Sequence, residues 1–84
     1  MASFYVLFSP DRHRYYIGST DDLASRVSRH QRGGVPSTRP YLPWVLVYHE
    51  EFSTRGEAQK REYQVKSYKG GEAFKRLITG LSSK

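Results

Sequence analysis

The chain contains no cysteine, which excludes disulfide bonds, zinc sites built on thiolates and a cysteine nucleophile. No apolar run has the length that crosses a membrane, and the N-terminus lacks the basic start of a signal peptide. We therefore expect a soluble, cytoplasmic protein without a membrane segment.

Acidic residues are few, because 8 Asp and Glu stand against 14 Lys and Arg, and the net charge is +6. Such a balance favours binding to polyanions or to anionic membranes, and a requirement for solubility is the alternative explanation. The length of 84 residues lies just above the range of roughly 70–80 residues in which a single core is marginal. We predict a single domain over residues 1–84 with its core in residues 3–79, so a large substrate would lie on its surface.

Two segments near the N-terminus have the composition of strands. Residues 4–8 are apolar or aromatic throughout, and residues 14–18 follow after a polar turn that contains Pro10. So short a connection predicts an antiparallel hairpin. Because alternate residues of a strand share a face, we expect Tyr5 and Tyr16 to become cross-strand neighbours if the register allows it.

Residues 19–44 predict a helix and then an irregular loop. Ser19 and Thr20 are cap-type residues, and Asp21 and Asp22 would meet the helix dipole in the first turn. The helix should run to about Gln31 and stop at the two glycines that follow. Residues 33–43 hold two Gly and three Pro and predict a rigid loop. Residues 44–52 predict a third strand that is apolar enough to be central in the sheet.

The C-terminal third of the chain predicts two more helices. Thr54 and Glu57 fit a capping box, from which a helix should extend to about Tyr68. A last helix before Gly80 is predicted by four apolar residues at helical spacing: Ala73, Phe74, Leu77 and Ile78. The order is strand, strand, helix, strand, helix, helix. We therefore predict an α/β fold, a small three-stranded antiparallel sheet with flanking helices.

Glu62 is the most informative position for chemistry. Ala58, Glu62 and Val65 fall on one line of the second predicted helix, so a carboxylate is expected among the residues that face the sheet. Burying an unpaired carboxylate is costly, and it therefore needs a cation. That cation is either a metal ion or, as the alternative, the partner in a buried salt bridge: Arg26, Arg61 or Lys66.

Four other residues would complete a site for phosphodiester hydrolysis. Arg26 and His30 lie four positions apart on one helix flank, and Tyr5 and Tyr16 lie on the predicted strands. A guanidinium stabilises the charge of a pentacovalent phosphate, and a phenol or imidazole moves the proton of water. Taken singly, each has a structural alternative: a solvated basic flank for Arg26 and His30, and core packing for the tyrosines.

The ordered set of these residues resembles the GIY-YIG nuclease family. Ser3-Phe4-Tyr5 stands where the family has Gly-Ile-Tyr, and Tyr16-Ile17-Gly18 is the second motif unaltered. The Arg-x-x-x-His step at Arg26 and His30, and then Glu62, follow at the family's spacing. The similarity covers residues 3–79. The chain looks most similar to the small, single-domain bacterial branch that resembles the nuclease module of an excinuclease.

The resemblance implies a metal-dependent DNA endonuclease, structure-selective or of low specificity, in DNA repair or recombination. Glu62 would be the sole protein ligand of one Mg²⁺ or Mn²⁺ ion. Arg26 would hold the scissile phosphate, His30 would assist proton transfer or the phosphate, and Tyr5 or Tyr16 would orient or deprotonate the attacking water. The candidate nucleic-acid contacts are Arg14, Arg29, Arg39 and Lys66.

Two departures from the family pattern leave other functions open. Ser19 stands where several active relatives carry a lysine, and the chain contains no asparagine, which many relatives use near the end of the domain. The alternatives are a non-catalytic nucleic-acid-binding or complex-forming module on the same fold, and a purely structural interaction domain. Because relatives commonly attach a separate DNA-binding domain, a homodimer or a protein partner is a further expectation.

Overall fold

The computed structural model describes residues 1–69 and 71–79, and it has the α/β architecture that the sequence predicts. Three antiparallel strands and three α-helices follow in the expected order, with one short 3-10 helix. The elements are β1 (Ala2–Ser9), β2 (Arg14–Thr20), α1 (Leu23–Gln31), η1 (Arg39–Tyr41), β3 (Val45–Phe52), α2 (Arg55–Lys66) and α3 (Glu72–Thr79). Within the described ranges, no helix has the length and apolar character that a membrane crossing requires.

The central strand of the sheet is β1, because the strand order is β2-β1-β3. Every residue from Ala2 to Leu7 is buried. The expectation that residues 44–52 form the central strand is wrong: β3 lies at an edge, and its Val45 and Val47 are 47% and 38% exposed. An apolar composition indicates that a strand contacts the core, but it does not say whether one neighbouring strand or two flank it.

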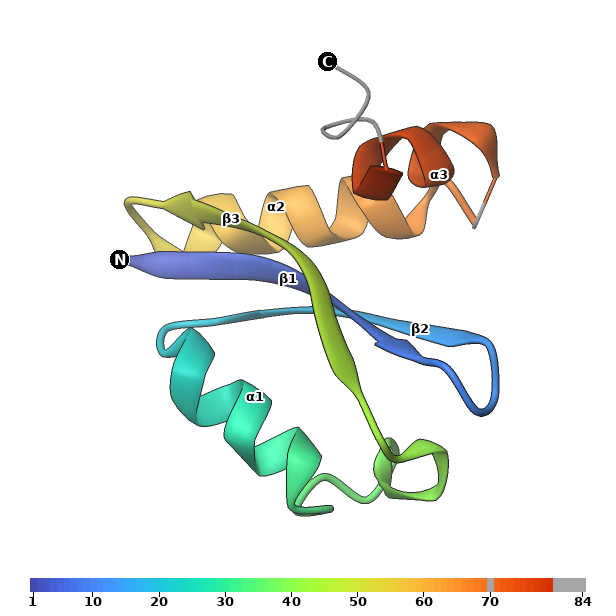
Figure 1. Ribbon diagram of the computed structural model, residues 1–84. Coiled ribbons are helices and arrows are strands. Elements are labelled where there is room, and N and C mark those ends of the chain that lie inside the picture. Colours follow the sequence, from blue (N-terminus) through green and yellow to red (C-terminus); the bar gives the residue numbers. More distant parts are fainter. Residues whose placement is uncertain (70, 80–84) are drawn as a thin grey trace.

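The helices cover opposite faces of the sheet, with α1 on one face and α2 and α3 on the other (Figure 1). Alternation along β1 sends its side chains to these two faces in turn. On the face covered by α1, here called the α1 face, the buried core residues are Tyr5, Leu7 and Trp44. On the opposite face, here called the α2 face, they are Phe4, Val6, Val65 and Phe74.

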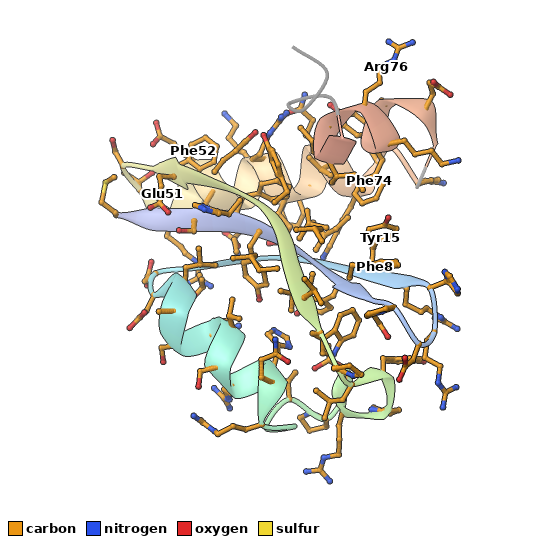
Figure 2. The ribbon with its side chains drawn as sticks, viewed as in Figure 1. Phe8, Tyr15, Glu51, Phe52, Phe74 and Arg76 are labelled. Atoms are coloured by element: carbon orange, nitrogen blue, oxygen red, sulfur yellow. The ribbon has the colours of Figure 1, made fainter. Side chains whose placement is uncertain are left out.

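The last helix contacts the hairpin through aromatic rings. Figure 2 shows Phe74 of α3 beside Tyr15 and Phe8, which come from the two strands of the hairpin. The ring centroids of Tyr15 and Phe74 lie 5.0 Å apart, and those of Phe8 and Tyr15 lie 4.9 Å apart. The first pair is edge-to-face and the second is tilted. Aromatic pairs contribute beyond the area that they bury. They help to hold α3 against the sheet.

The start of α1 differs from the prediction. Strand β2 continues through Ser19 and Thr20, because these residues pair with Phe4 and Ser3 of β1. The cap is Asp22, whose carboxylate accepts a hydrogen bond from the backbone of Ser25, and no acidic residue lies in the first turn. Strand pairing therefore overrides the capping preference of Ser19 and Thr20.

The start of α2 agrees with the prediction. The capping box of Thr54 and Glu57 is present with both of its hydrogen bonds. The helix ends at Lys66, two residues before the expected end at Tyr68. Helix ends vary by this much because the last turn often loosens.

Candidate active site

Gly18 allows the ring of Tyr5 to extend from the central strand over the edge strand β2. Tyr5 pairs with Gly18 across the hairpin, and Tyr16 pairs with Leu7, so the two tyrosines are diagonal neighbours rather than direct partners. A Cβ atom at Gly18 would lie 2.8 Å from the Tyr5 hydroxyl oxygen and 3.1 Å from Tyr16 Cε2. The glycine of the second motif is thus required by the close approach of both rings, whose centroids are 6.2 Å apart.

A buried chain of hydrogen bonds fixes the position of the Tyr5 hydroxyl. The Tyr5 oxygen lies 3.1 Å from His30 Nε2, and His30 Nδ1 lies 2.9 Å from Thr38 Oγ1. Thr38 donates its one proton to the carbonyl of Val35 at 3.3 Å, so it accepts from His30 Nδ1–H. His30 Nε2 then accepts the proton of Tyr5. Tyr5 and His30 are completely buried, and Thr38 is 2% exposed.

The surroundings keep both titratable members of this chain neutral. Burial raises the pKa of Tyr5 well above its usual range, the nearby Tyr16 and Glu62 raise it further, and the guanidinium of Arg26 opposes the rise. Burial lowers the pKa of His30 below its ordinary value, and the positive charges of Arg26 and Arg29 act in the same direction. The imidazole is therefore an acceptor for Tyr5 and carries no charge near pH 7.

Arg26 and Tyr16 lie next to this chain but are less buried. Arg26 comes from α1, and its charge acts on both the Tyr5 hydroxyl and the His30 ring. Tyr16 comes from β2 and keeps part of its surface exposed. Its ring centroid is 4.8 Å from that of His30 and 6.4 Å from that of Trp44. The predicted solvated flank of α1 is thus wrong for His30, which faces the core.

Glu62 approaches the same edge of the sheet from α2. Its side chain is 14% exposed, and Ala58 and Val65 on the same line of the helix are buried. Glu62 Oε1 accepts a hydrogen bond of 2.7 Å from Ser19 Oγ, and Ser19 directly follows Gly18 in β2. The Glu62 charge also acts on the Tyr5 hydroxyl. The charge of Glu62, which comes from the α2 face, therefore acts on a hydroxyl of the α1 face.

The partner of the Glu62 carboxylate among the protein's own cations is Lys66. Lys66 Nζ lies 2.7 Å from Glu62 Oε2, one helical turn away. Of the other two partners considered from the sequence, Arg61 binds Glu50 at 2.9 Å instead, and Arg26 lies toward Tyr5. A salt bridge is present, with Lys66 as its cation, but it is not buried, because the Lys66 side chain is 50% exposed.

The donor atoms at this edge fit a hard divalent cation with one protein ligand. In the described part of the chain, no group of three or more His, Cys, Asp or Glu could hold a metal ion. Each oxygen of a carboxylate offers about two acceptor positions, so contacts to Ser19 and Lys66 leave a position on each oxygen of Glu62. Mg²⁺ commonly uses one or two carboxylates and fills its shell with water and substrate phosphate.

Comparison with known proteins decides the family. A family model described as the GIY-YIG catalytic domain matches residues 1–74. The chain belongs to the GIY-YIG family. This is a nuclease-type family whose members generally use a divalent metal and act on DNA.

The similar proteins are small members that carry the name UPF0213. The UPF0213 protein of Staphylococcus haemolyticus is 34% identical over 79 residues, which are 92% of this chain and 96% of that protein. That of Staphylococcus aureus is 44% identical over 54 residues, 63% of this chain and 66% of that protein. The solution NMR structure of the UPF0213 protein from Bacillus halodurans matches with a TM-score of 0.55 and 31% identity. It covers 96% of this chain and 85% of that one.

The four nucleic-acid contacts expected from the GIY-YIG resemblance lie in two places. Three of them lie at the segment of residues 33–41: Arg39 is part of the segment, and Arg14 and Arg29 contact it. The guanidinium of Arg14 lies 5.0 Å from the ring centroid of Tyr41, and Arg39 donates to a backbone carbonyl of the segment at 3.0 Å. Lys66 lies apart from them on α2, at the carboxylate.

Two residues of this GIY-YIG site were not assigned to it from the sequence. Thr38 orients His30, and its own carbonyl accepts a hydrogen bond of 2.9 Å from the indole of Trp44. Ser19, expected to cap a helix, instead binds Glu62. The only signal for Thr38 was its place in the family pattern before Trp44. Nothing in the local sequence relates a loop hydroxyl to a histidine eight residues earlier.

Proposed function

We propose that this protein is a divalent-metal-dependent DNA endonuclease that hydrolyses phosphodiester bonds, structure-selective or of low specificity, in DNA repair or recombination. The observation that supports this proposal is the surroundings of the Tyr5 hydroxyl. It is hydrogen-bonded to His30, and its pKa responds to Tyr16, Arg26 and Glu62. These five side chains come from four elements, and the charges of Arg26 and Glu62 both act on this one hydroxyl. An acidic group and an arginine that act on the same hydroxyl are of use to a metal-dependent hydrolase, whereas the acidic group is of little use to a protein that only binds phosphate.

The two tyrosines differ in what they are suited to do. The Tyr5 hydroxyl is buried and donates to His30, and its raised pKa disfavours loss of its proton. Tyr16 keeps exposed surface next to it. Tyr16 is thus the better group to orient or deprotonate the attacking water. In this proposal Tyr5 and His30 are positioning residues that hold the edge of the site rigid.

Arg26 and Glu62 take the two electrostatic roles. The guanidinium of Arg26 can bind two oxygens of the scissile phosphate in a planar fork and stabilise the charge that develops on them. Glu62 would hold one Mg²⁺ or Mn²⁺ ion, which when bound supplies charge neutralisation at the phosphate and the leaving oxygen. Water attacks the phosphorus in line, and the 3′ oxygen leaves. The products carry a 5′-phosphate and a 3′-hydroxyl.

The test compares cleavage by wild type, Glu62→Gln and Glu72→Gln. Glu72 is an exposed carboxylate on α3, so its variant controls for the loss of one negative charge. Supercoiled plasmid and single-stranded, flapped and four-way-junction DNAs are incubated with Mg²⁺ or Mn²⁺. We expect Glu62→Gln to lose cleavage by a factor of roughly 100 or more while it still binds DNA, because the lost contact is made in the transition state. Equal activity in wild type and Glu62→Gln would overturn the proposal.

A second comparison assigns the tyrosines. We expect Tyr16→Phe to reduce the cleavage rate by about 10²–10⁴, the range for loss of a general acid or base. Tyr5→Phe should cost less, because the ring stays in place above Gly18. The reverse ranking would make Tyr5 the group that acts on water.

The alternative function is a nucleic-acid-binding module without activity. Two observations support it. Ser19 stands where active relatives carry a lysine, and Glu62 already forms an ion pair with Lys66. This alternative requires DNA binding by wild type without cleavage at any metal concentration. If four basic side chains contact phosphates, the slope of log affinity against log salt should be roughly −3 to −4.

We also propose that the protein is cytoplasmic and forms one domain over residues 1–84. Such a domain would cover only a few base pairs of DNA. A second copy of the chain or a protein partner would extend that surface. A monomeric mass in light scattering, together with tight binding of DNA by the isolated protein, would contradict this part of the proposal.

A further inference from the structure

Lys66 forms an ion pair with Glu62, the carboxylate that would bind the metal in the proposed function. We propose that Lys66 holds Glu62 in the metal-free protein and moves from it to a DNA phosphate when metal and DNA bind, which makes the two binding events favour each other. This inference rests on the proposed function, because it assumes that Glu62 binds the ion. It adds a role for Lys66 and a source of coupling between metal and substrate.

The geometry shows a carboxylate held from two sides. Ser19 Oγ donates to Glu62 Oε1 at 2.7 Å, and Lys66 Nζ lies 2.7 Å from Glu62 Oε2. The Glu62 side chain is 14% exposed, whereas that of Lys66 is 50% exposed. The carboxylate is therefore fixed at the sheet edge, and the ammonium approaches it from the solvent side. A charge that comes from solvent can return there without disturbing the core.

A divalent ion bound to Glu62 and the ammonium of Lys66 would repel each other. Mg²⁺ binds carboxylate oxygens at about 2.0–2.1 Å. An ion bound to Glu62 would therefore lie close to the Lys66 ammonium if that ammonium stayed 2.7 Å from the carboxylate. Two cations at such a distance repel each other strongly in a partly buried site. Metal binding is therefore expected to weaken the contact between Glu62 and Lys66.

A DNA phosphate offers the displaced ammonium a new partner. Lys66 is a compact charge on a flexible stem, and the phosphate bound by Arg26 and the metal would lie at the same edge. DNA thus removes the competitor of the metal, and the metal frees a cation for DNA. By linkage, the factor by which DNA tightens metal binding equals the factor by which metal tightens DNA binding.

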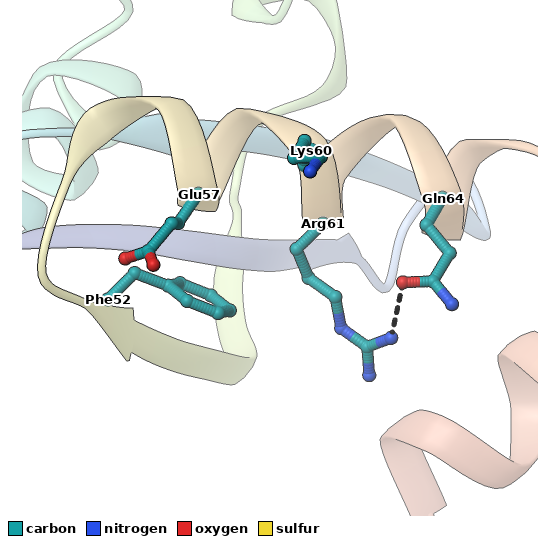
Figure 3. Close-up of a pocket in the computed structure, with 5 residues that line it drawn as sticks. All are labelled: Phe52, Glu57, Lys60, Arg61 and Gln64. Carbon is teal, nitrogen blue, oxygen red and sulfur yellow. Dashed lines mark hydrogen bonds between the residues drawn. The ribbon is translucent and has the colours of Figure 1, made fainter.

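Two other basic residues of α2, Arg61 and Lys60, do not offer this exchange. Arg61 is held by two hydrogen bonds to Glu50, at 2.9 and 3.1 Å, and by one to Gln64 at 3.0 Å, which Figure 3 shows. Lys60 lies on the same helix but lines an open groove of about 440 Å³ together with Phe52 and Gln64. Lys60 therefore provides a matched control, because its removal changes the net charge of α2 by the same amount away from Glu62.

The experiment measures binding of Mn²⁺ alone by isothermal titration calorimetry and by electron paramagnetic resonance of the free ion. The proteins are wild type, Lys66→Met, Lys60→Met and Glu62→Gln. We expect Lys66→Met to bind Mn²⁺ roughly two- to fivefold more tightly than Lys60→Met, the factor that corresponds to loss of one solvent-exposed ion pair. Glu62→Gln should lose the binding.

A second arm adds a short double-stranded DNA with phosphorothioate linkages that resist hydrolysis. Wild type and Lys60→Met should bind Mn²⁺ more tightly with this DNA than without it. Lys66→Met should show a smaller gain, because it has no ammonium to transfer. Equal gains in all three proteins would contradict the transfer of Lys66 to phosphate.

The outcomes separate this inference from the proposed function. If Glu62→Gln loses Mn²⁺ but Lys66→Met and Lys60→Met bind it equally, Glu62 remains the ligand and the role of Lys66 is wrong. If Glu62→Gln binds Mn²⁺ as wild type does, the metal site of the proposed function fails. A measurement on wild type avoids any folding defect of a variant: Mg²⁺ should shift the NMR signals of the Lys66 ammonium and leave those of Lys60 unchanged.

Discussion

Strand β1 contributes side chains to both faces of the sheet, and the two faces differ in polarity. On the α2 face, β1 contributes Phe4 and Val6 to a core cluster whose buried side chains are all hydrocarbon. On the α1 face, β1 contributes Tyr5, whose hydroxyl begins a buried chain of hydrogen bonds through His30 to Thr38. The first face is expected to supply most of the stability. The second holds polar groups in one arrangement, which matters for a site and adds less to stability.

A short chain can combine a core and a site in a single strand. The period of two along β1 sends an apolar residue to one face and a functional residue to the other in successive positions. Burial of apolar area is tolerant of detail, whereas a buried polar chain must satisfy each of its donors and acceptors. Mutations on the α2 face should therefore change stability, and those on the α1 face should change geometry and protonation.

The largest effect is expected from Phe4→Ala on the α2 face. Phe4 is completely buried, with its ring centroid 6.1 Å from that of Tyr48. Loss of such a ring costs about 3–5 kcal/mol of unfolding free energy. Urea denaturation measures it, with Val45→Ala at an exposed edge position as the control, which should change by less than about 0.5 kcal/mol. Equal losses in both variants would mean that the α2 face is not the main source of stability.

Gly18→Ala should disturb the α1 face by steric overlap. The added methyl would lie 2.8 Å from the Tyr5 hydroxyl and 2.9 Å from Tyr5 Cζ, so the ring must move away from His30. Overpacking of this kind costs typically about 1–3 kcal/mol. Gly56→Ala is the matched control, because the nearest atom to its new methyl is 4.0 Å away. An unchanged Tyr5–His30 contact in the NMR spectrum of Gly18→Ala would show that the close approach is not required.

Thr38→Val should leave His30 Nδ1–H without its acceptor while it preserves the shape of the side chain. An unsatisfied buried donor costs about 1–3 kcal/mol. The substitution also has an effect that a packing defect would not have, because the proton of His30 is no longer held on Nδ1. The ¹⁵N chemical shifts of the ring report this change of tautomer. Thr38→Ser keeps the hydroxyl and should keep the wild-type pattern. The same tautomer in both variants would show that Thr38 does not orient His30.

The smallest effect is a dependence of stability on pH that comes from His30. Its pKa is lowered in the folded protein, so below the unfolded value of about 6.5 the unfolded chain binds more protons than the native one. Stability from this residue is therefore complete above about pH 6.5 and falls as the pH drops toward the lower folded pKa. The slope contributed by one proton is at most about 1.4 kcal/mol per pH unit.

Denaturation of wild type and His30→Gln between pH 7.5 and 5.5 measures that slope. The variant removes the titrating group, so the difference in stability between the two proteins should shrink as the pH falls. A constant difference would mean that His30 keeps its ordinary pKa in the fold.

Much of the fold follows from local rules in the sequence. The hairpin follows from two apolar segments joined by a short polar turn, and the start of α2 follows from the capping box of Thr54 and Glu57. The line of Ala58, Glu62 and Val65 toward the sheet follows from the helical period. These rules involve residues only a few positions apart, so the local sequence is sufficient to apply them.

The residues of the candidate site could be named from the family pattern, but their contacts could not. Local rules made Ser19 a cap and His30 part of a solvated flank, whereas the structure joins the first to Glu62 and buries the second against Tyr5. The partner of Glu62 was one of three cations, and only the arrangement of α2 at the edge of the sheet selects Lys66.

The local sequence predicts which segments become strands and helices, and which side chains of each segment share a face, because these depend on periods of two and 3.6 residues. The central place of β1, the position of Tyr5 opposite Gly18 and the hydrogen bond between Ser19 and Glu62 follow from the folded arrangement alone. The reason is that strand order and register depend on contacts between residues far apart in the chain. A local pattern is compatible with several such arrangements, and their relative free energy is set by packing of the whole domain.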